Sequence, residues 1–222
     1  WFLTTIGADG PSNAAASLGT LIHAVAEEHP HGTPEELTEA LEARIEELGY
    51  NLDTWAGRHS DRRARAIVEN LASYLVGIPG RVDVEQKVEA QVESVTIRGR
   101  MDRLEYVDEG VRVTDLKTGS NSDPYRKVDE NAQLAAYQLA LLASGEDVAG
   151  ARIALLGTKK KPQTFDQKPL QGEALAQWRN KVREVAASAR GPYFEARPSD
   201  AACAYCSFDR LCPARERGHK VV

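Results

Sequence analysis

The chain has 222 residues, of which 42% are hydrophobic, and a formal net charge of −5. This apolar content permits an ordinary buried core, and no stretch approaches the roughly 20 apolar residues of a membrane-spanning helix. The first residues lack the charged and apolar regions of a signal peptide, and the negative charge argues against non-specific wrapping of nucleic acid. We therefore expect a cytoplasmic protein that does not enter a membrane.

Three helices are predicted in the first 80 residues. An apolar stripe indicates a helix over Ala14–Glu28, and a capping box with proline at the first helical position begins another at Thr33. Inward-facing apolar residues indicate a third helix from about Asp61 to Val76. Because the chain begins at Trp1 and its only methionine is Met101, we expect it to be part of a longer polypeptide.

A β-meander is predicted after the helices. From Arg81 onwards, β-branched residues largely alternate with charged ones, as in half-buried antiparallel strands. Two runs, Val95–Val107 and Val111–Lys117, are joined at Asp108-Glu109-Gly110, a glycine-containing hairpin loop. These runs predict an antiparallel pair at the centre of the fold.

The segments after the hairpin predict a crossover to a parallel strand. An amphipathic helix over Asp129–Ser144 precedes a short apolar strand over Ala151–Leu156, a combination that indicates a right-handed βαβ unit. A further helix is expected over Gly172–Ala189. We therefore predict one α/β domain, residues 1–222, with a mixed central sheet flanked by helices. Its parts are a helical N-terminal elaboration (1–80), a core (81–160), and a C-terminal helix with a cysteine cluster (161–222).

Two aspartates and a lysine gather on the predicted hairpin. Asp102 and Asp115 stand at nearly equal distances from the turn, so in an antiparallel pair they lie roughly opposite each other. Lys117 is two residues from Asp115, and the strand's period of two places both on one face. Such a patch suits a divalent metal, a phosphate and an activated water, whereas scattered surface charge is the alternative.

Gln133 and Tyr137 stand four residues apart on the helix that follows this hairpin, and project from one face. Because the helix comes directly after the Asp115–Lys117 strand, its first turns can lie over the same patch. Placed there, the pair could hold a phosphate or a base edge. The alternative for such a pair is simple packing.

Four short motifs together resemble the RecB-type branch of the PD-(D/E)xK nucleases, over about residues 14 to 215. They are Gly19-x-x-x-His23, Gly99-x-x-Asp102-Arg103, Asp115-x-Lys117-Thr118-Gly119 and Gln133-x-x-x-Tyr137. Met101 stands where the superfamily name has proline, a residue that this branch often lacks. The resemblance implies a restriction-endonuclease-like fold and a metal-dependent deoxyribonuclease of the exonuclease type.

The resemblance also implies roles for individual residues. Asp102 and Asp115 would bind Mg²⁺ or Mn²⁺, with the backbone carbonyl of Leu116 as another ligand. His23 would complete or orient the metal site, although a core histidine is the alternative. Lys117 would orient the attacking water or stabilise the charge of the scissile phosphate.

An acidic residue on the preceding strand matches the family more loosely. Glu85 would lie beside the metal or bind a second ion, and plain surface charge on the strand is the alternative.

Three cysteines form a compact cluster near the C-terminus, Cys203-x-x-Cys206-x5-Cys212. Their number and spacing argue against a disulfide framework and indicate a metal or an iron–sulfur cluster. With His219 as fourth ligand the site would be a Cys₃His zinc site. In some members of the resembled family, three C-terminal cysteines and one far upstream hold a [4Fe–4S] cluster, which implies a fourth cysteine upstream of Trp1.

Lys159, Lys160 and Lys161 follow the last predicted strand, where the backbone of DNA would pass the active face. A solvated basic surface is the alternative for this run.

The resemblance suggests a biological setting as well. We expect the C-terminal nuclease of a helicase–nuclease subunit of the AdnA/AdnB type, acting in double-strand-break end resection and repair. Its partners would be DNA, a helicase motor domain in the same polypeptide and a second helicase–nuclease subunit. The alternatives are a stand-alone iron–sulfur exonuclease of the CRISPR-adaptation type and a catalytically idle DNA-binding module.

Overall fold

The computed structural model describes residues 14–47, 53–78, 80–158, 160–191 and 198–203, together with residues 206, 208, 212 and 214. The chain divides into two compact units, one of residues Ala15–Val185 and one of Trp1–Ala14 with Ala186–Val222. The first unit contains the whole sheet. The second unit includes the short helix α7 (Asp200–Cys203).

Five strands form one sheet in the order β1-β2-β3-β4-β5. Their bounds are Val82–Val92 (β1), Val95–Val107 (β2), Gly110–Lys117 (β3), Val148–Leu155 (β4) and Gln163–Gln167 (β5). The first three strands are antiparallel neighbours and β4 runs parallel to β3. This confirms the predicted mixed α/β sheet.

β5 departs from the prediction that the parallel strand comes last, because it pairs antiparallel with β4. Its sequence, Gln-Thr-Phe-Asp-Gln, has neither the β-branched run nor the apolar alternation that signals a strand. An edge strand of this kind depends on its backbone pairing rather than on its side-chain pattern.

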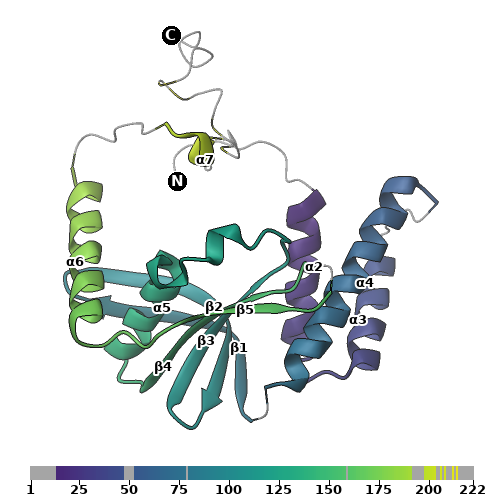
Figure 1. Ribbon diagram of the computed structural model, residues 1–222, viewed down its shortest axis with the longest axis horizontal. Helices are drawn as coiled ribbons and strands as arrows, with labels where there is room; N and C mark the ends of the chain where they lie inside the picture. The colour runs from purple at the N-terminus through teal and green to yellow at the C-terminus, as the bar shows by residue number, and fades with distance from the viewer. Residues whose placement is uncertain are drawn as a thin grey trace. The chain divides into compact units, whose positions relative to one another are not determined.

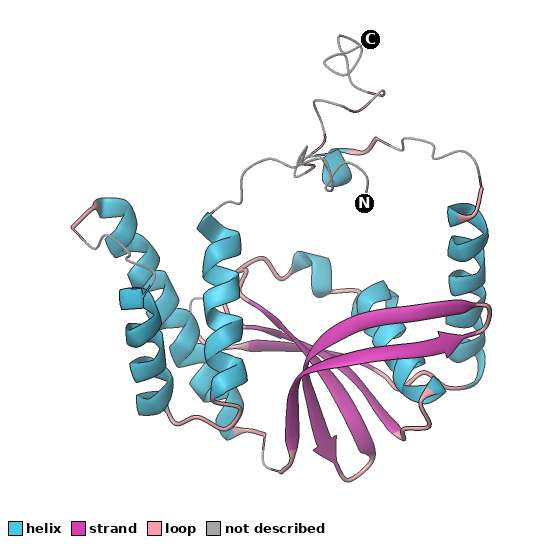
Figure 2. Ribbon diagram, turned by 180° about the vertical axis from the view of Figure 1, so that it is seen from behind, coloured by secondary structure: helices cyan, strands magenta, loops and turns pink. Residues whose placement is uncertain are grey.

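The helices pack on both sides of the sheet, as Figures 1 and 2 show. Their bounds are Ala14–Glu28 (α2), Pro34–Glu47 (α3), Trp55–Val76 (α4), Ala132–Ala143 (α5) and Gly172–Ala189 (α6), with 3₁₀ turns at Asp123–Tyr125 (η1) and Val128–Glu130 (η2). In the described part of the chain, no helix is long and apolar enough to cross a membrane.

Two helices begin at other residues than the sequence predicts, in both cases because of a cap. α4 begins at Trp55 rather than near Asp61, since the hydroxyl of Thr54 accepts a 3.0 Å hydrogen bond from the amide of Gly57. α5 begins at Ala132, since the side chain of Asn131 caps it and the preceding residues form η2. The capping box predicted at the start of α3 is present.

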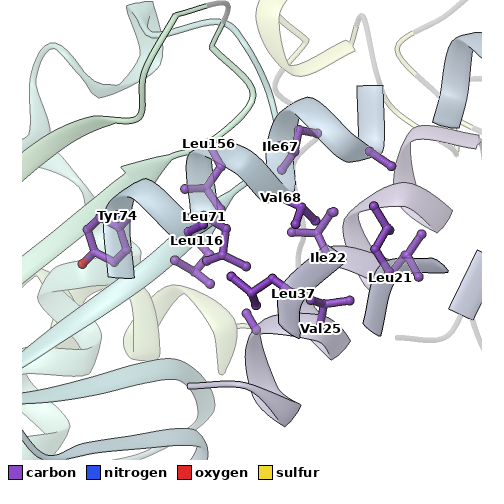
Figure 3. Packing of buried hydrophobic residues seen from close by; sticks show 14 of the residues in the cluster. Leu21, Ile22, Val25, Leu37, Ile67, Val68, Leu71, Tyr74, Leu116 and Leu156 are labelled. Atoms are coloured by element: carbon purple, nitrogen blue, oxygen red, sulfur yellow. The ribbon is translucent and has the colours of Figure 1, made fainter. Parts of the chain in front are cut away.

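One hydrophobic core lies between α2, α3, α4 and the sheet. In Figure 3, Ile22, Leu37 and Leu71 from these three helices form one cluster with Leu116 of β3. All four are at most 2% exposed, and burying each such side chain stabilises the fold by about 1.5–3 kcal/mol. Because Leu116 directly follows Asp115, this core fixes the end of the strand that carries the predicted site.

On the other face, α5 packs on β3 and β4, and α6 packs against α5 and the β1–β2 hairpin. Leu134 of α5 meets Val113 and Ile153 in one cluster, and Leu139 joins Trp178 of α6 in another. Figure 2 shows α2, α3 and α4 gathered on one side of the sheet and α5 and α6 on the other.

A buried polar network joins α4 to β2 and β3. The hydroxyl of Tyr74 donates to Glu105 Oε1 at 2.6 Å, and the guanidinium of Arg112 donates to Glu105 Oε2 at 2.9 and 3.0 Å. Burial raises the pKa of the Tyr74 hydroxyl, so it remains a donor at neutral pH. The network therefore pairs a carboxylate that is wholly buried beneath the helix.

Candidate active site

Asp102 on β2 and Asp115 on β3 lie at the same level of the sheet. The register pairs Arg103 with Thr114, and the next position along each strand is one of the two aspartates. Asp102 Oδ2 accepts a 2.7 Å hydrogen bond from the backbone amide of Leu116. That bond holds the Asp102 carboxylate at the end of β3, beside the residue predicted to offer its carbonyl to a metal.

Glu85 on β1 extends this pair to a row of three carboxylates. The residues on either side of Glu85 pair with those on either side of Asp102, which places the two acidic residues opposite each other. Glu85 has a φ of 50°, a left-handed conformation that costs an L-residue about 1–2 kcal/mol, and the pairing is interrupted there. Arg100 Nε lies 2.7 Å from Glu85 Oε2.

His23 reaches the same carboxylates from α2. Its Nδ1 lies 3.5 Å from Asp102 Oδ1. His23, Glu85 and Asp102 each offer a ligand atom, and these atoms lie within 4.8 Å of one another. Three donors from α2, β1 and β2 are thus close enough to share one ion. Asp115 lies outside this group of three, on the Lys117 side of Asp102.

Lys117 and Gln133 hold the carboxylate of Asp115 from two sides. Lys117 Nζ is 2.7 Å from Asp115 Oδ2, and Gln133 Nε2 donates to Asp115 Oδ1 at 2.8 Å. Lys117 Nζ also donates to Gln133 Oε1 at 3.4 Å. A carboxylate, a cation and an amide therefore form a closed triangle on one face of β3.

Tyr137 lies one turn beyond Gln133 on α5 and fixes the helix to β2. Its hydroxyl accepts from Gln133 Nε2 at 3.2 Å and donates to the carbonyl of Arg100 at 2.8 Å. A Cβ at Gly99 would lie 3.0 Å from Tyr137 Cε1, closer than nearly all such contacts. The glycine therefore leaves the room that the tyrosine ring occupies against the strand.

All of these side chains line one open cavity of about 480 Å³. The sequence-predicted residues among its lining are His23, Glu85, Asp102, Asp115, Lys117, Gln133 and Tyr137. Segments that are more than 100 residues apart in the chain thus meet at one place.

The titration of Asp115 and Lys117 follows from their burial together. Burial raises the pKa of the Asp115 carboxyl, and the Lys117 ammonium opposes that effect without cancelling it. For Lys117, burial lowers the pKa, but the attraction and hydrogen bond of Asp115 outweigh it and the pKa is raised. Lys117 is therefore a cation at neutral pH.

The pKa values of His23 and Glu85 are also raised. The hydrogen bond to Asp102 raises the pKa of His23 against the opposing effect of burial. Burial raises the pKa of Glu85, opposed by the nearby Arg100 guanidinium. Both shifts reflect acidic groups crowded together in a partly buried place.

A comparison with protein-family models gives a match over residues 1–213 to the PD-(D/E)XK nuclease superfamily. The chain belongs to this superfamily. The predicted family, whose motifs meet in the cavity described above, is therefore confirmed at the level of the superfamily.

Two solved structures are similar to this nuclease domain. The crystal structure of SSO0001 is 16% identical, with a TM-score of 0.46, and the match covers 89% of this chain and 96% of that chain. A proposed exonuclease from Eubacterium rectale is 13% identical, with a TM-score of 0.48, covering 89% and 81% of the two chains. A comparison with curated proteins gives no match.

The donors of the nuclease site fit a divalent cation. The site offers carboxylate oxygens and one imidazole, a set that suits Mn²⁺ and Mg²⁺. Glu85 Oε2 and Asp115 Oδ2 are buried and lie 2.7 Å from the side-chain cations of Arg100 and Lys117, respectively. A carboxylate oxygen has two lone pairs, so each keeps spare acceptor capacity for an ion. Buried oxygens with spare acceptor capacity are expected where an ion completes the site.

Two charged residues of the lining, Arg100 and Glu27, were not predicted from the sequence. Arg100 could have been found from strand alternation, because it stands two residues before Asp102 on β2 and the period of two places both side chains on one face. Glu27 stands four residues after His23, hence on the same face of α2.

The predicted basic run lies in the β4–β5 connection. Lys160 and Lys161 are exposed there, and Lys159 lies outside the described residues. Neither Lys160 nor Lys161 is part of the cavity lining.

The three cysteines belong to the second compact unit of the nuclease, where all three are free thiols. Cys203 ends α7, and the amide of Cys206 donates to its carbonyl at 3.4 Å. Among the described residues, His23, Glu85 and Asp102 are the group with three candidate ligand atoms within 4.8 Å of one another, so the three thiols are not gathered that closely. His219 lies outside the described residues.

Proposed function

We propose that the chain is a Mg²⁺- or Mn²⁺-dependent deoxyribonuclease of the exonuclease type that hydrolyses phosphodiester bonds. One observation carries the proposal. Asp102, Asp115 and Lys117, the residues that the motifs single out, lie around one open cavity with His23 and Glu85.

The role that we propose for each side chain follows from its contacts. His23, Glu85 and Asp102 would hold the cation, with Asp115 at its edge. The cation, when bound, supplies charge that makes a water molecule more acidic and offsets the negative charge of the phosphate.

Lys117 would act through its charge rather than as a base. Because its pKa is raised by Asp115, it keeps its proton at neutral pH and offers a fixed positive charge to the phosphate. Gln133, bonded to both residues, would hold them in register, and Tyr137 would hold Gln133 and the strand edge.

The metal requirement gives a first test. Linear DNA is incubated with the 222-residue protein in Mn²⁺, Mg²⁺ or EDTA, and the products are resolved on a denaturing gel. We expect mono- or oligonucleotides in either metal and intact DNA in EDTA. Cleavage that is undiminished in EDTA would contradict the proposal.

We further propose that this is the C-terminal nuclease of a cytoplasmic helicase–nuclease subunit of the AdnA/AdnB type, acting with a second such subunit in double-strand-break end resection. The RecB-type motifs and the three-cysteine spacing support this setting. The natural full-length polypeptide should then hydrolyse ATP on DNA ends. A full-length polypeptide without ATPase activity would instead favour a stand-alone exonuclease of the CRISPR-adaptation type.

The cysteines would hold a [4Fe–4S] cluster together with a cysteine upstream of this chain. The support is the Cys-x-x-Cys spacing with a third thiol nearby and three thiols free of disulfides. The full-length protein, purified without oxygen, should contain about four iron and four sulfide per chain and absorb near ~400 nm. Stoichiometric zinc in a colourless protein would favour the Cys₃His site with His219.

A further inference from the structure

The N-terminal end of α4 carries an exposed aromatic pair. Trp55, at the first helical position, is a large hydrophobic side chain that is 71% exposed. The inner face of the same helix is buried. The rings of Trp55 and His59 stack with centroids 5.3 Å apart and planes 10° apart. One face of the indole is thus covered by the imidazole while the ring as a whole remains open to a ligand.

Two exposed arginines follow the aromatic pair. Neither Arg62 nor Arg63 forms an ion pair with any residue that the structure describes. Arg65, two positions after Arg63, is paired with both Asp61 and Glu42. The positive charge of the first two arginines is therefore available, while that of the third is already compensated inside the fold.

α4 runs from this end to the end of β3, next to the active site. The guanidinium of Arg63 lies 3.5 Å from the carbonyl of Thr118, the residue after Lys117. At 1.5 Å per residue, Trp55 stands about 12 Å further along the helix axis than Arg63. Figure 1 shows this end of α4 projecting beyond the strands. The helix therefore touches the residue that directly follows Lys117.

The β4–β5 connection adds basic residues to the same edge. Asn70 of α4 donates to the carbonyls of Leu156 and Thr158, which fixes the start of this connection against the helix. A Cβ on Gly157 would lie 2.2 Å from the carbonyl of Gly119, so the connection also touches the loop after β3. The exposed Lys160 and Lys161 follow within this connection.

We propose that the projecting end of α4 binds single-stranded DNA that passes through the active site. A base stacks on the open face of Trp55, and phosphates lie along Arg62 and Arg63 towards Lys117. The proposal rests on the proposed nuclease function, because that function makes DNA the ligand of the site. An exposed aromatic ring beside uncompensated arginines is the combination that binds single strands without reading sequence.

The test measures binding without cleavage, so that it does not depend on catalysis. A fluorescein-labelled 20-mer of thymidylate is titrated in EDTA with the 222-residue protein and its Trp55→Ala and Trp55→Phe variants, and anisotropy is recorded. We expect Trp55→Ala to bind about 5- to 100-fold more weakly and Trp55→Phe to recover most of the loss. Thermal unfolding of each variant checks that it is folded.

The arginines have a separate readout. Arg62→Ala should make the slope of log affinity against log salt shallower by about 0.7, the value for one phosphate contact on a single strand. Arg98→Ala serves as the matched control, since it removes the same charge from an exposed arginine on β2 that pairs with Glu89. This control should leave the slope unchanged.

Two outcomes would overturn the inference. If the parent and Trp55→Ala bind the 20-mer equally well, Trp55 does not contact the DNA and would be a contact for another protein. If the parent does not bind the 20-mer at all, single-stranded DNA is not the ligand of this surface. A protein that binds through Trp55 but cuts no DNA in Mn²⁺ would instead contradict the proposed function and leave this inference standing. The two failures are thus distinguishable.

Discussion

The carboxylate of Asp102 on β2 accepts a hydrogen bond from the backbone amide of Leu116 on β3. The side chain therefore has two roles, since its other oxygen lies 3.5 Å from His23 in the group that would hold the cation. One role is structural and the other concerns the ion, and substitution can separate them.

Asparagine and alanine at position 102 should have different effects. Asp102→Asn keeps an oxygen that can accept from Leu116, so its stability should stay close to that of the parent while Mn²⁺ affinity falls. Asp102→Ala leaves a buried amide unsatisfied and should lose a further 1–3 kcal/mol, roughly, of unfolding free energy. Denaturant unfolding and Mn²⁺ titration check both. Equal stability of the two variants would contradict the structural role.

The affinity for Mn²⁺ should fall as the solution becomes more acidic. The pKa of His23 is raised, chiefly by its hydrogen bond to Asp102, so at every pH below that raised pKa the ion must displace a proton. Below the pKa of His23, we expect affinity to fall about tenfold per pH unit. His23→Gln should flatten this part of the curve, and His31→Gln, at an exposed histidine, should not.

The raised pKa of His23 also affects the stability of the metal-free protein. Acid should favour this stability, whereas it should weaken Mn²⁺ binding. A histidine whose pKa is higher in the folded state stabilises the fold below its unfolded pKa, and this contribution is lost as the pH rises through the folded value. Metal-free His23→Gln should therefore be destabilised, relative to the parent, more at pH ~5.5 than at pH ~8, as measured by denaturant unfolding. The reverse order would contradict the interaction with Asp102.

Glu85 combines backbone strain with an acidic role. Asparagine tolerates a φ of 50° better than glutamate, so Glu85→Asn should raise the unfolding free energy by about 1 kcal/mol while weakening Mn²⁺ binding. Glu93, in the β1–β2 turn, has a φ of 56° and pairs with Arg183 on the surface. Glu93→Asn should leave Mn²⁺ affinity unchanged. If Glu85→Asn binds Mn²⁺ as tightly as the parent does, Glu85 is not part of the cation site.

The buried hydroxyl of Tyr74 should matter for stability and not for cleavage. Tyr74→Phe removes a 2.6 Å hydrogen bond to the buried Glu105, at an expected cost of about 1–3 kcal/mol. Tyr106→Phe, which removes a 2.8 Å bond to the partly exposed Asp83, should cost less. Chemical denaturation measures both costs. A larger cost at Tyr106 would contradict the account of the network.

The central hairpin could be predicted because the residues that define it are close together in the sequence. Asp102, Asp115 and Lys117 are placed by a short turn and by the alternation of a strand, and both are visible in the sequence. Gln133 and Tyr137 follow from helical spacing and from the short connection to that strand.

Other features depend on contacts that the local pattern does not contain. β5 is a polar edge strand that exists because β4 offers it a partner. The position of Glu85 beside His23 depends on how α2 packs against the sheet, in a core formed by residues from three helices. The length of α4 depends on a single cap at Thr54, and the exposed Trp55 next to it has no apolar pattern around it.

The most direct test of the central claim compares two aspartate variants in Mn²⁺ on the same linear DNA. Asp115→Asn changes the carboxylate held by Lys117 and Gln133, whereas Asp166→Asn changes an exposed carboxylate on β5 that is paired with Arg152. We predict that Asp115→Asn cleaves at least about 100-fold more slowly than the parent while folding and binding DNA, and that Asp166→Asn cleaves as the parent does. Cleavage by Asp115→Asn at the parent's rate would contradict the account.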